Sequence, residues 1–122
     1  MTNHRLQIRV RIYCGDEIAM GPGKADLLDA IASHGSISGA ARVLDLSYRR
    51  AWLLVDAMNR CWKEPLVATA PGGGAWVSEF GAAILAGYRA IQLAAECVEG
   101  SSDWARMQAG LLAVPRVHQG DD

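Results

Sequence analysis

The stretch 36–47 constrains the fold of this chain more than any other part of it. It contains two adjacent small residues and then a short apolar segment with one acid, namely Ala40, Ala41, Leu44, Asp45 and Leu46. Two helices can approach closely where the side chains between them are small, and an apolar residue in the turn fills the remaining space. Serine is a preferred residue at a helix N-terminus, so Ser47 can begin the second helix. The stretch therefore predicts two helices joined by a tight turn, either a helix-turn-helix or a purely structural pair.

Apolar residues on both sides of this turn recur at helical spacing. Leu27, Leu28 and Ile31 predict a helix over about 23–34 that ends at Gly35, with His34 as its last residue. A short helix follows, for which Ser36 and Ser38 are candidate N-caps. The next helix should run from Tyr48 to about residue 62, on the spacing of Ala51, Val55, Met58 and Trp62.

Three segments have the patterns of strands. Residues 6–12 alternate between apolar and polar side chains, which is typical of a half-buried strand. Residues 66–70 and 75–77 enclose Pro71-Gly72-Gly73-Gly74, which predicts a hairpin. The order of helix, short helix, turn, helix and hairpin is that of a winged helix-turn-helix, with the first strand expected to pair with the hairpin. The expected class is α+β, mainly α.

A long helix is expected over about 79–98, because Phe80 and the residues after it form one apolar stripe. A helix of roughly 20 residues is about 30 Å long, more than a small domain needs to cover, so part of it should contact a second copy of the chain. The residues expected in this dimer interface are Ile84, Tyr88, Ile91, Ala95 and Val98.

The chain after residue 99 is expected to be an appendage. Ser101 to Asp103 supply an N-cap for a short helix over about 103–113, carrying Trp104, Met107, Leu111 and Leu112. Residues from Arg116 on should be mobile. We therefore divide the 122 residues into one compact domain over 1–99 and a short helix with a flexible tail over 100–122.

Charge is distributed unevenly along the chain. The net charge is only −1, yet residues 1–63 carry nine basic and six acidic side chains, and residues 64–122 carry three and seven. Such asymmetry is compatible with ordinary solvated surface, but it also predicts one face that binds an anion.

Several classes of function are not supported by the sequence. The cysteines at 14, 61 and 97 and the histidines at 4, 34 and 118 are scattered, so neither a disulfide framework nor a metal site is expected. Gly21-Pro22-Gly23-Lys24 lacks the earlier glycine and the following Ser/Thr of a phosphate-binding loop, and we expect no enzyme. No apolar run approaches membrane-spanning length and no secretory signal begins the chain, so a cytoplasmic protein without membrane contact is expected.

Several motifs between Ile8 and about Ala94 resemble the DNA-binding domain of ModE-type molybdenum-dependent transcriptional regulators, relatives of the LysR helix-turn-helix. The matching stretches are Gly21-Pro22-Gly23-Lys24, Gly35-Ser36-Ile37-Ser38-Gly39-Ala40-Ala41, Leu46-Ser47-Tyr48-Arg49 with Ala51-Trp52, Met58-Asn59, and Val77-Ser78-Glu79-Phe80-Gly81. The resemblance implies a homodimeric transcriptional regulator that binds an inverted-repeat operator. The family's molybdate-binding region has no counterpart in these residues, so no cofactor and no binding of molybdate are expected.

The helix-turn-helix pattern also names candidate DNA contacts. Arg49 and Arg50 lie in the first turn of the expected recognition helix, where side chains contact base edges, although two solvated arginines would have the same pattern. Ser47 is a phosphate donor or only a cap, and Tyr48 contacts a base or packs on the preceding helix. The phosphate contacts are assigned to Lys24, Arg42, Arg60 and Lys63. A protein-interaction module that keeps the winged fold without binding DNA is the alternative.

Overall fold

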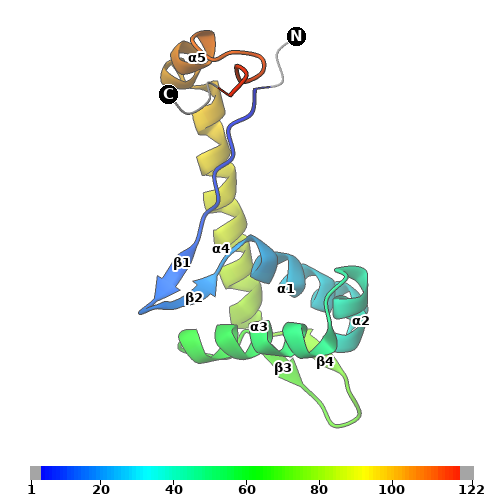
Figure 1. Ribbon diagram of the computed structural model, residues 1–122. Coiled ribbons are helices and arrows are strands. Elements are labelled where there is room, and N and C mark those ends of the chain that lie inside the picture. Colours follow the sequence, from blue (N-terminus) through cyan, green and yellow to red (C-terminus); the bar gives the residue numbers. More distant parts are fainter. Residues whose placement is uncertain (1–3, 119–122) are drawn as a thin grey trace.

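The computed structural model describes residues 4–118, in which one strand pair precedes three helices and a second strand pair precedes the remaining helices (Figure 1). The strands are β1 (Ile12–Cys14), β2 (Glu17–Met20), β3 (Val67–Thr69) and β4 (Ala75–Val77). The helices are α1 (Pro22–His34), α2 (Ile37–Val43), α3 (Tyr48–Cys61), α4 (Glu79–Glu96) and α5 (Ser102–Ala109), with a 3-10 turn at Cys97–Gly100. Strands β1 and β2 form one antiparallel pair, and β3 and β4 form another.

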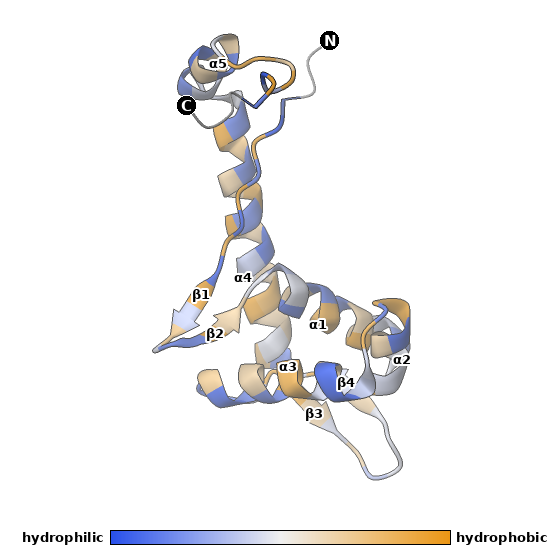
Figure 2. Ribbon diagram, viewed as in Figure 1, coloured by the Kyte–Doolittle hydropathy of each residue, from blue (hydrophilic) through white to orange (hydrophobic). Residues whose placement is uncertain are grey.

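The elements form a helical body from which one helix projects. Figure 1 shows α1, α2 and α3 together with the β3–β4 hairpin, while α4 leaves this body and extends to α5. The buried core draws on all of these parts, because Leu28 of α1, Met58 of α3, Leu66 before β3 and Tyr88 of α4 belong to one apolar cluster. The part of α4 up to Tyr88 therefore packs on the body. Figure 2 shows further apolar residues along the part of α4 that extends beyond it.

The ends of α1 and α3 agree closely with the predicted ones, because local hydrogen bonds define them. Helix α1 ends at Gly35, whose φ of 71° is unfavourable for residues with a Cβ and whose N–H donates to Ile31 at 2.8 Å. Ser36 Oγ accepts the Gly39 N–H at 2.9 Å, and Ser47 Oγ accepts the Arg50 N–H at 3.0 Å. The candidate cap Ser38 is instead inside α2.

The tight turn between α2 and α3 is also present. Asp45 adopts a left-handed conformation with φ of 57°, and the Leu46 N–H donates to the Ala41 carbonyl at 2.8 Å. Ala40 and Ala41 are buried, and Leu44 and Leu46 pack partly against the core. Small residues at the helix contact and apolar residues in the turn thus occupy the predicted places.

The strand predicted over 6–12 is wrong. Only Ile12 belongs to β1, and β1 pairs with β2 across a turn at Gly15, not with the β3–β4 hairpin. The preceding residues run beside α4, where the Tyr88 hydroxyl donates to the Val10 carbonyl at 2.7 Å. Alternating side chains require an extended chain with one apolar side, but that side can pack on a helix as well as extend a sheet.

The C-terminal helices are shorter than predicted. Helix α4 ends at Glu96 and Val98 lies in the 3-10 turn, while α5 ends at Ala109, so Leu111 and Leu112 lie beyond it. Gly110 lies directly after the end of α5, and Gly100 is the last residue of the 3-10 turn that follows α4, consistent with the weak helix propensity of glycine. The tail predicted to be mobile from Arg116 lies partly outside the described residues, since 119–122 are not described.

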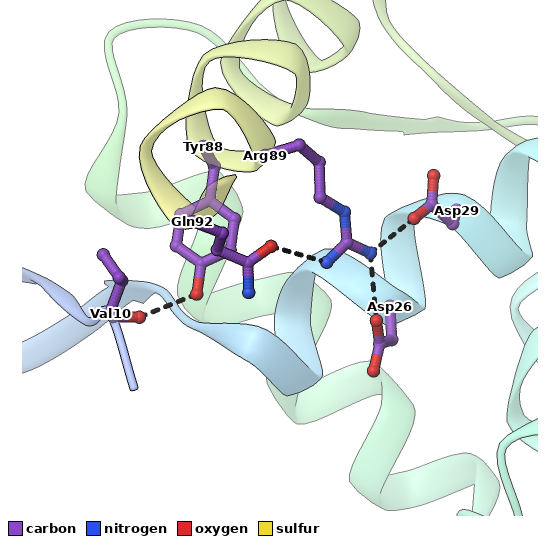
Figure 3. A network of polar contacts seen from close by, with 6 residues as sticks. All are labelled: Val10, Asp26, Asp29, Tyr88, Arg89 and Gln92. Carbon is purple, nitrogen blue, oxygen red and sulfur yellow. Dashed lines mark hydrogen bonds and ion pairs between the residues drawn. The ribbon is translucent and has the colours of Figure 1, made fainter. Parts of the chain in front are cut away.

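A polar network joins α4 to α1 (Figure 3). The Arg89 guanidinium pairs with both Asp26 and Asp29, and its second terminal nitrogen donates to Gln92 at 2.9 Å. The hydrogen bond with Asp29, and then the one with Asp26, raise the pKa of Arg89 against the opposing effect of burial. For the neighbouring Tyr88, burial raises the pKa. The two aspartates thus hold α4 against the helical body.

Candidate nucleic-acid interface

The first turn of α3 presents basic side chains to solvent. Arg49 and Arg50 are exposed, and among the described residues neither forms an ion pair with a carboxylate. Ser47 is the N-cap of this turn, and its Oγ accepts the Arg50 N–H. No acidic residue lies in the first turn of α3 to compensate the two arginines. This end of the helix therefore offers two uncompensated cations.

An aromatic pair lies next to these arginines. The ring of Tyr48, which is 54% exposed, meets the edge of Trp52 with centroids 6.3 Å apart and planes inclined by 74°. Both rings line a pocket of about 260 Å³ that reaches the β3–β4 hairpin, together with Ile37, Ser38, Thr69, Ala70, Gly73 and Gly74. Tyr48 therefore contacts the next turn of its own helix, and a groove separates α3 from the hairpin. We did not predict the participation of Trp52, Ser38 or Thr69 from the sequence, because the hairpin's position depends on tertiary packing.

The β3–β4 hairpin is uncharged throughout. Its register pairs Val67 with Val77 and Thr69 with Ala75, and its tip carries Gly72 and Gly73 with φ of 96° and 99°. These left-handed conformations explain why glycines occupy the tip. Since residues 66–78 include no charged side chain, the hairpin can offer an anion only backbone N–H groups and hydroxyls.

Asn59 joins the end of α3 to the first strand of this hairpin. Its Oδ1 accepts the Leu66 and Val67 N–H groups at 2.9 and 3.1 Å, and its Nδ2 donates to the Val67 carbonyl at 3.0 Å. Three hydrogen bonds from one amide thus determine how the hairpin is placed relative to α3.

We expect Asn59→Asp to destabilise the protein by about 1–3 kcal/mol, because the donor to the Val67 carbonyl is lost and a carboxylate oxygen takes its place. Chemical denaturation of both proteins measures this difference. Gln7→Glu makes the same amide-to-acid change at an exposed position and should have little effect. Equal losses in the two variants would contradict a clamping role for Asn59.

The four predicted phosphate contacts are not gathered in one place. Arg60 is already paired with Glu17 at 3.0 Å and Asp56 at 2.8 Å, and hydrogen bonding to Asp56 foremost raises its pKa. Lys63 lies just beyond the C-terminal end of α3, and Arg42 is exposed in the last turn of α2. Helix α3 has 14 residues and is about 20 Å long, so Arg60 lies far from the basic first turn. The charge of Arg60 is thus paired with carboxylates of the same chain.

Lys24 differs from these three in its surroundings. It lies in the first turn of α1 and lines a pocket with Arg9, Arg11 and Arg50. Burial lowers its pKa, and nearby Arg50 and Arg11 act in the same direction while Glu17 opposes them. The two arginines of the N-terminal segment were not among the predicted site residues. The sequence shows that Arg9 and Arg11 alternate with apolar residues, but it does not show that they face the start of α1.

The predicted dimer residues divide into two groups. Tyr88 is 2% exposed and Ile84 packs against the core, so the assignment of Tyr88 to an intermolecular interface is wrong. Tyr88 was placed on the stripe by its spacing, and the N-terminal segment and α1 already cover it. Ile91 and Val98 are 50% and 47% exposed, and Ala95 is partly exposed. An apolar surface remains on the second half of α4 and the turn after it.

A metal-binding cluster, a membrane-spanning helix and a disulfide bond were each sought in the described part of the chain. Residues 4–118 include no cluster of three potential metal ligands and no helix able to cross a membrane, and none of their three cysteines forms a disulfide bond.

Sequence comparison relates this chain to molybdenum-associated binding and transport proteins. It is 44% identical over 77 residues to the molybdenum-pterin-binding protein MopA of Rhodobacter capsulatus, covering 60% of this chain and 29% of that protein. It is 37% identical over 97 residues to the molybdenum transport protein ModE of Azotobacter vinelandii, covering 76% of this chain and 36% of ModE. MopB of Rhodobacter capsulatus is 46% identical over 77 residues, covering 60% and 28%. No family model matches the chain.

The chain is thus a homologue of ModE and of the Mop proteins, and it spans about a third of the length of these relatives. The names of these relatives describe binding and transport, not an enzymatic reaction. The relatives also correct one expectation. The expectation that molybdate does not bind this chain is contradicted, because two of the matched relatives are named molybdenum-pterin-binding proteins. The expectation relied on the absence of one recognisable region, which does not exclude binding elsewhere.

Proposed function

We propose that this chain is a winged helix-turn-helix module that binds double-stranded DNA in a molybdenum-related regulatory role. The observation that carries the proposal is the first turn of α3, where Arg49 and Arg50 are exposed and unpaired beside a groove that leads to the β3–β4 hairpin. In this proposal α3 is the recognition helix and the hairpin is the wing. Homology to ModE supports the molybdenum-related, regulatory part.

The electrostatics of α3 fit insertion into the major groove. A recognition helix contacts base edges with its N-terminal residues, and arginine forms paired hydrogen bonds with guanine. Arg49 has no carboxylate partner among the described residues, so base contact would break no ion pair. Tyr48 and Trp52 would border the same groove from the wing side, where their exposed edges can contact sugars or thymine methyl groups.

Selection of bound fragments from the source genome, followed by shift assays at several salt concentrations, tests this function. We expect Arg49→Ala to weaken binding to a selected site by about 1–3 kcal/mol, roughly 5- to 150-fold, and binding to random DNA much less. Arg106→Ala, on exposed α5, is the matched control and should leave the selectivity unchanged. Equal losses on selected and random DNA would contradict base contact by Arg49.

A protein-interaction module is the second candidate, and the uncharged wing favours it. Trp76 of β4 is 51% exposed on a hairpin without any basic residue, which suits a protein surface better than a phosphate backbone. The same shift assays separate the two functions. No binding of any fragment at low salt would favour the interaction module, since non-specific binding by a DNA-binding domain is strongest there.

A further inference from the structure

A second pocket, which no residue of the β3–β4 hairpin lines, gathers four of the nine basic residues of the N-terminal half. It measures about 380 Å³ and lies where the N-terminal segment, the start of α1, the α2–α3 turn and the first turns of α3 meet. Arg9, Arg11, Lys24 and Arg50 all line it, and Asp26 is its single acidic residue. Apolar side chains form the remainder of the wall, including Ile18, Leu44, Leu46 and Leu54.

Two carboxylates lie near the positive charge of this pocket, but both are paired with arginines outside it. Asp26 is engaged by Arg89 at 2.9 Å, which draws its carboxylate toward α4. Among residues 4–118, none of the four cations forms an ion pair with a carboxylate. Burial is the first cause of the lowered pKa of Lys24. Glu17, which is paired with Arg60, opposes this effect, while Arg50 and Arg11 add to it. Folding thus brings four cations together without an ion pair to a carboxylate.

The backbone adds donors to the same wall. The first turn of α1 has no side-chain cap, since its N-cap is Gly21, and Gly23 and Lys24 contribute N–H groups at a helix N-terminus. Gly21, Pro22 and Gly23 themselves line the pocket, and a Cβ at Gly23 would meet nothing within 4 Å. The backbone is therefore accessible to a ligand here.

We propose that this pocket binds a tetrahedral oxyanion, either free in solution or as a phosphodiester of DNA. Arginine forks and a lysine ammonium arranged around a small volume suit a compact anion that accepts hydrogen bonds on all sides. No aromatic side chain lines the pocket, so it offers no surface on which a nucleobase would stack. The free-anion form is independent of the proposed DNA binding, whereas the phosphodiester form rests on it.

The free-anion form is tested by thermal unfolding and calorimetry of the full chain with sodium molybdate, and with sodium sulfate as a second tetrahedral dianion, at constant ionic strength. We expect a saturable rise in Tm for the wild type. Lys24→Met should weaken this binding at least tenfold, and Arg11→Met provides a second variant of the same wall. Arg106→Met removes a cation of α5, outside the pocket, and should bind as the wild type does.

The phosphodiester form is tested by the salt dependence of DNA binding. Lys24→Met should lower the slope of log K against log salt by about one, and Arg106→Ala should leave it unchanged. Loss of anion stabilisation in Lys24→Met supports a free ligand, and a reduced slope without anion stabilisation supports a DNA phosphate. Wild-type behaviour of Lys24→Met and Arg11→Met in both assays overturns the proposal. In that case a selective loss in Arg49→Ala would still leave the DNA-binding function standing.

Discussion

Gly81→Ala is expected to destabilise the protein by about 1–3 kcal/mol or more, because the added methyl group has no space. Gly81 lies in the first turn of α4, where a Cβ would overlap the carbonyl oxygen of Leu66 and lie 3.0 Å from its carbonyl carbon and Cα. These are backbone atoms, and the same carbonyl accepts the Ser78 N–H at 2.9 Å, so neither side can move alone. Thermal and denaturant unfolding of the variant measure the loss.

Gly87→Ala on the same helix is the matched control. A Cβ at Gly87 meets nothing within 4 Å, and alanine is the better helix former, so a gain of roughly 0.5–1 kcal/mol is expected. The two variants have the same change in composition and opposite expected signs. Equal effects would show that the contact between Gly81 and Leu66 does not control how α4 packs beside the hairpin.

The local features of the fold were predictable because residues close in sequence determine them. Gly35 ends α1, Ser47 caps α3 and Ser78 caps α4, each through a hydrogen bond within four residues. Pro71 and the three glycines after it separate β3 from β4 as predicted. The reason for Gly81 in the 77–81 motif was not visible, since its neighbour Leu66 lies 15 positions earlier and only the folded chain brings them together.

The candidate site was predictable only in part for the same reason. Arg49 and Arg50 follow from the position of the α2–α3 turn, which is local. The pairing of Arg60 with Glu17 joins α3 to β2 across 43 positions, and no spacing rule indicates it. The convergence of Arg9 and Lys24 likewise depends on the N-terminal segment lying beside the helical body, where a strand paired with the hairpin was expected.

Ile91→Asp is expected to convert a dimer into a monomer and to abolish binding to a selected operator. A single winged domain contacts few base pairs and would discriminate poorly among a genome's competing sites, so we propose that two copies act together. The second half of α4 supplies an unpartnered apolar surface, on which Ile91 is 50% exposed and Ala95 lies one turn further along the same face. At a two-fold interface Ile91 would be covered by the second copy, and each aspartate would then be buried without a partner.

The variant should fold as a monomer, because Ile91 is half exposed in the single chain and its removal leaves the core unchanged. Ala86→Asp introduces the same charge at an exposed position of α4 on another side of the helix, and should remain dimeric. Sedimentation at micromolar concentration distinguishes the outcomes. A dimer that persists in Ile91→Asp places the contact elsewhere, and a monomeric wild type contradicts the dimer.

If two copies pair across α4, their recognition helices should contact half-sites one helical turn apart, about 34–36 Å, or a multiple of it. The selected operators should therefore be inverted repeats, and inserting half a turn between the half-sites should reduce wild-type affinity to that of Ile91→Asp.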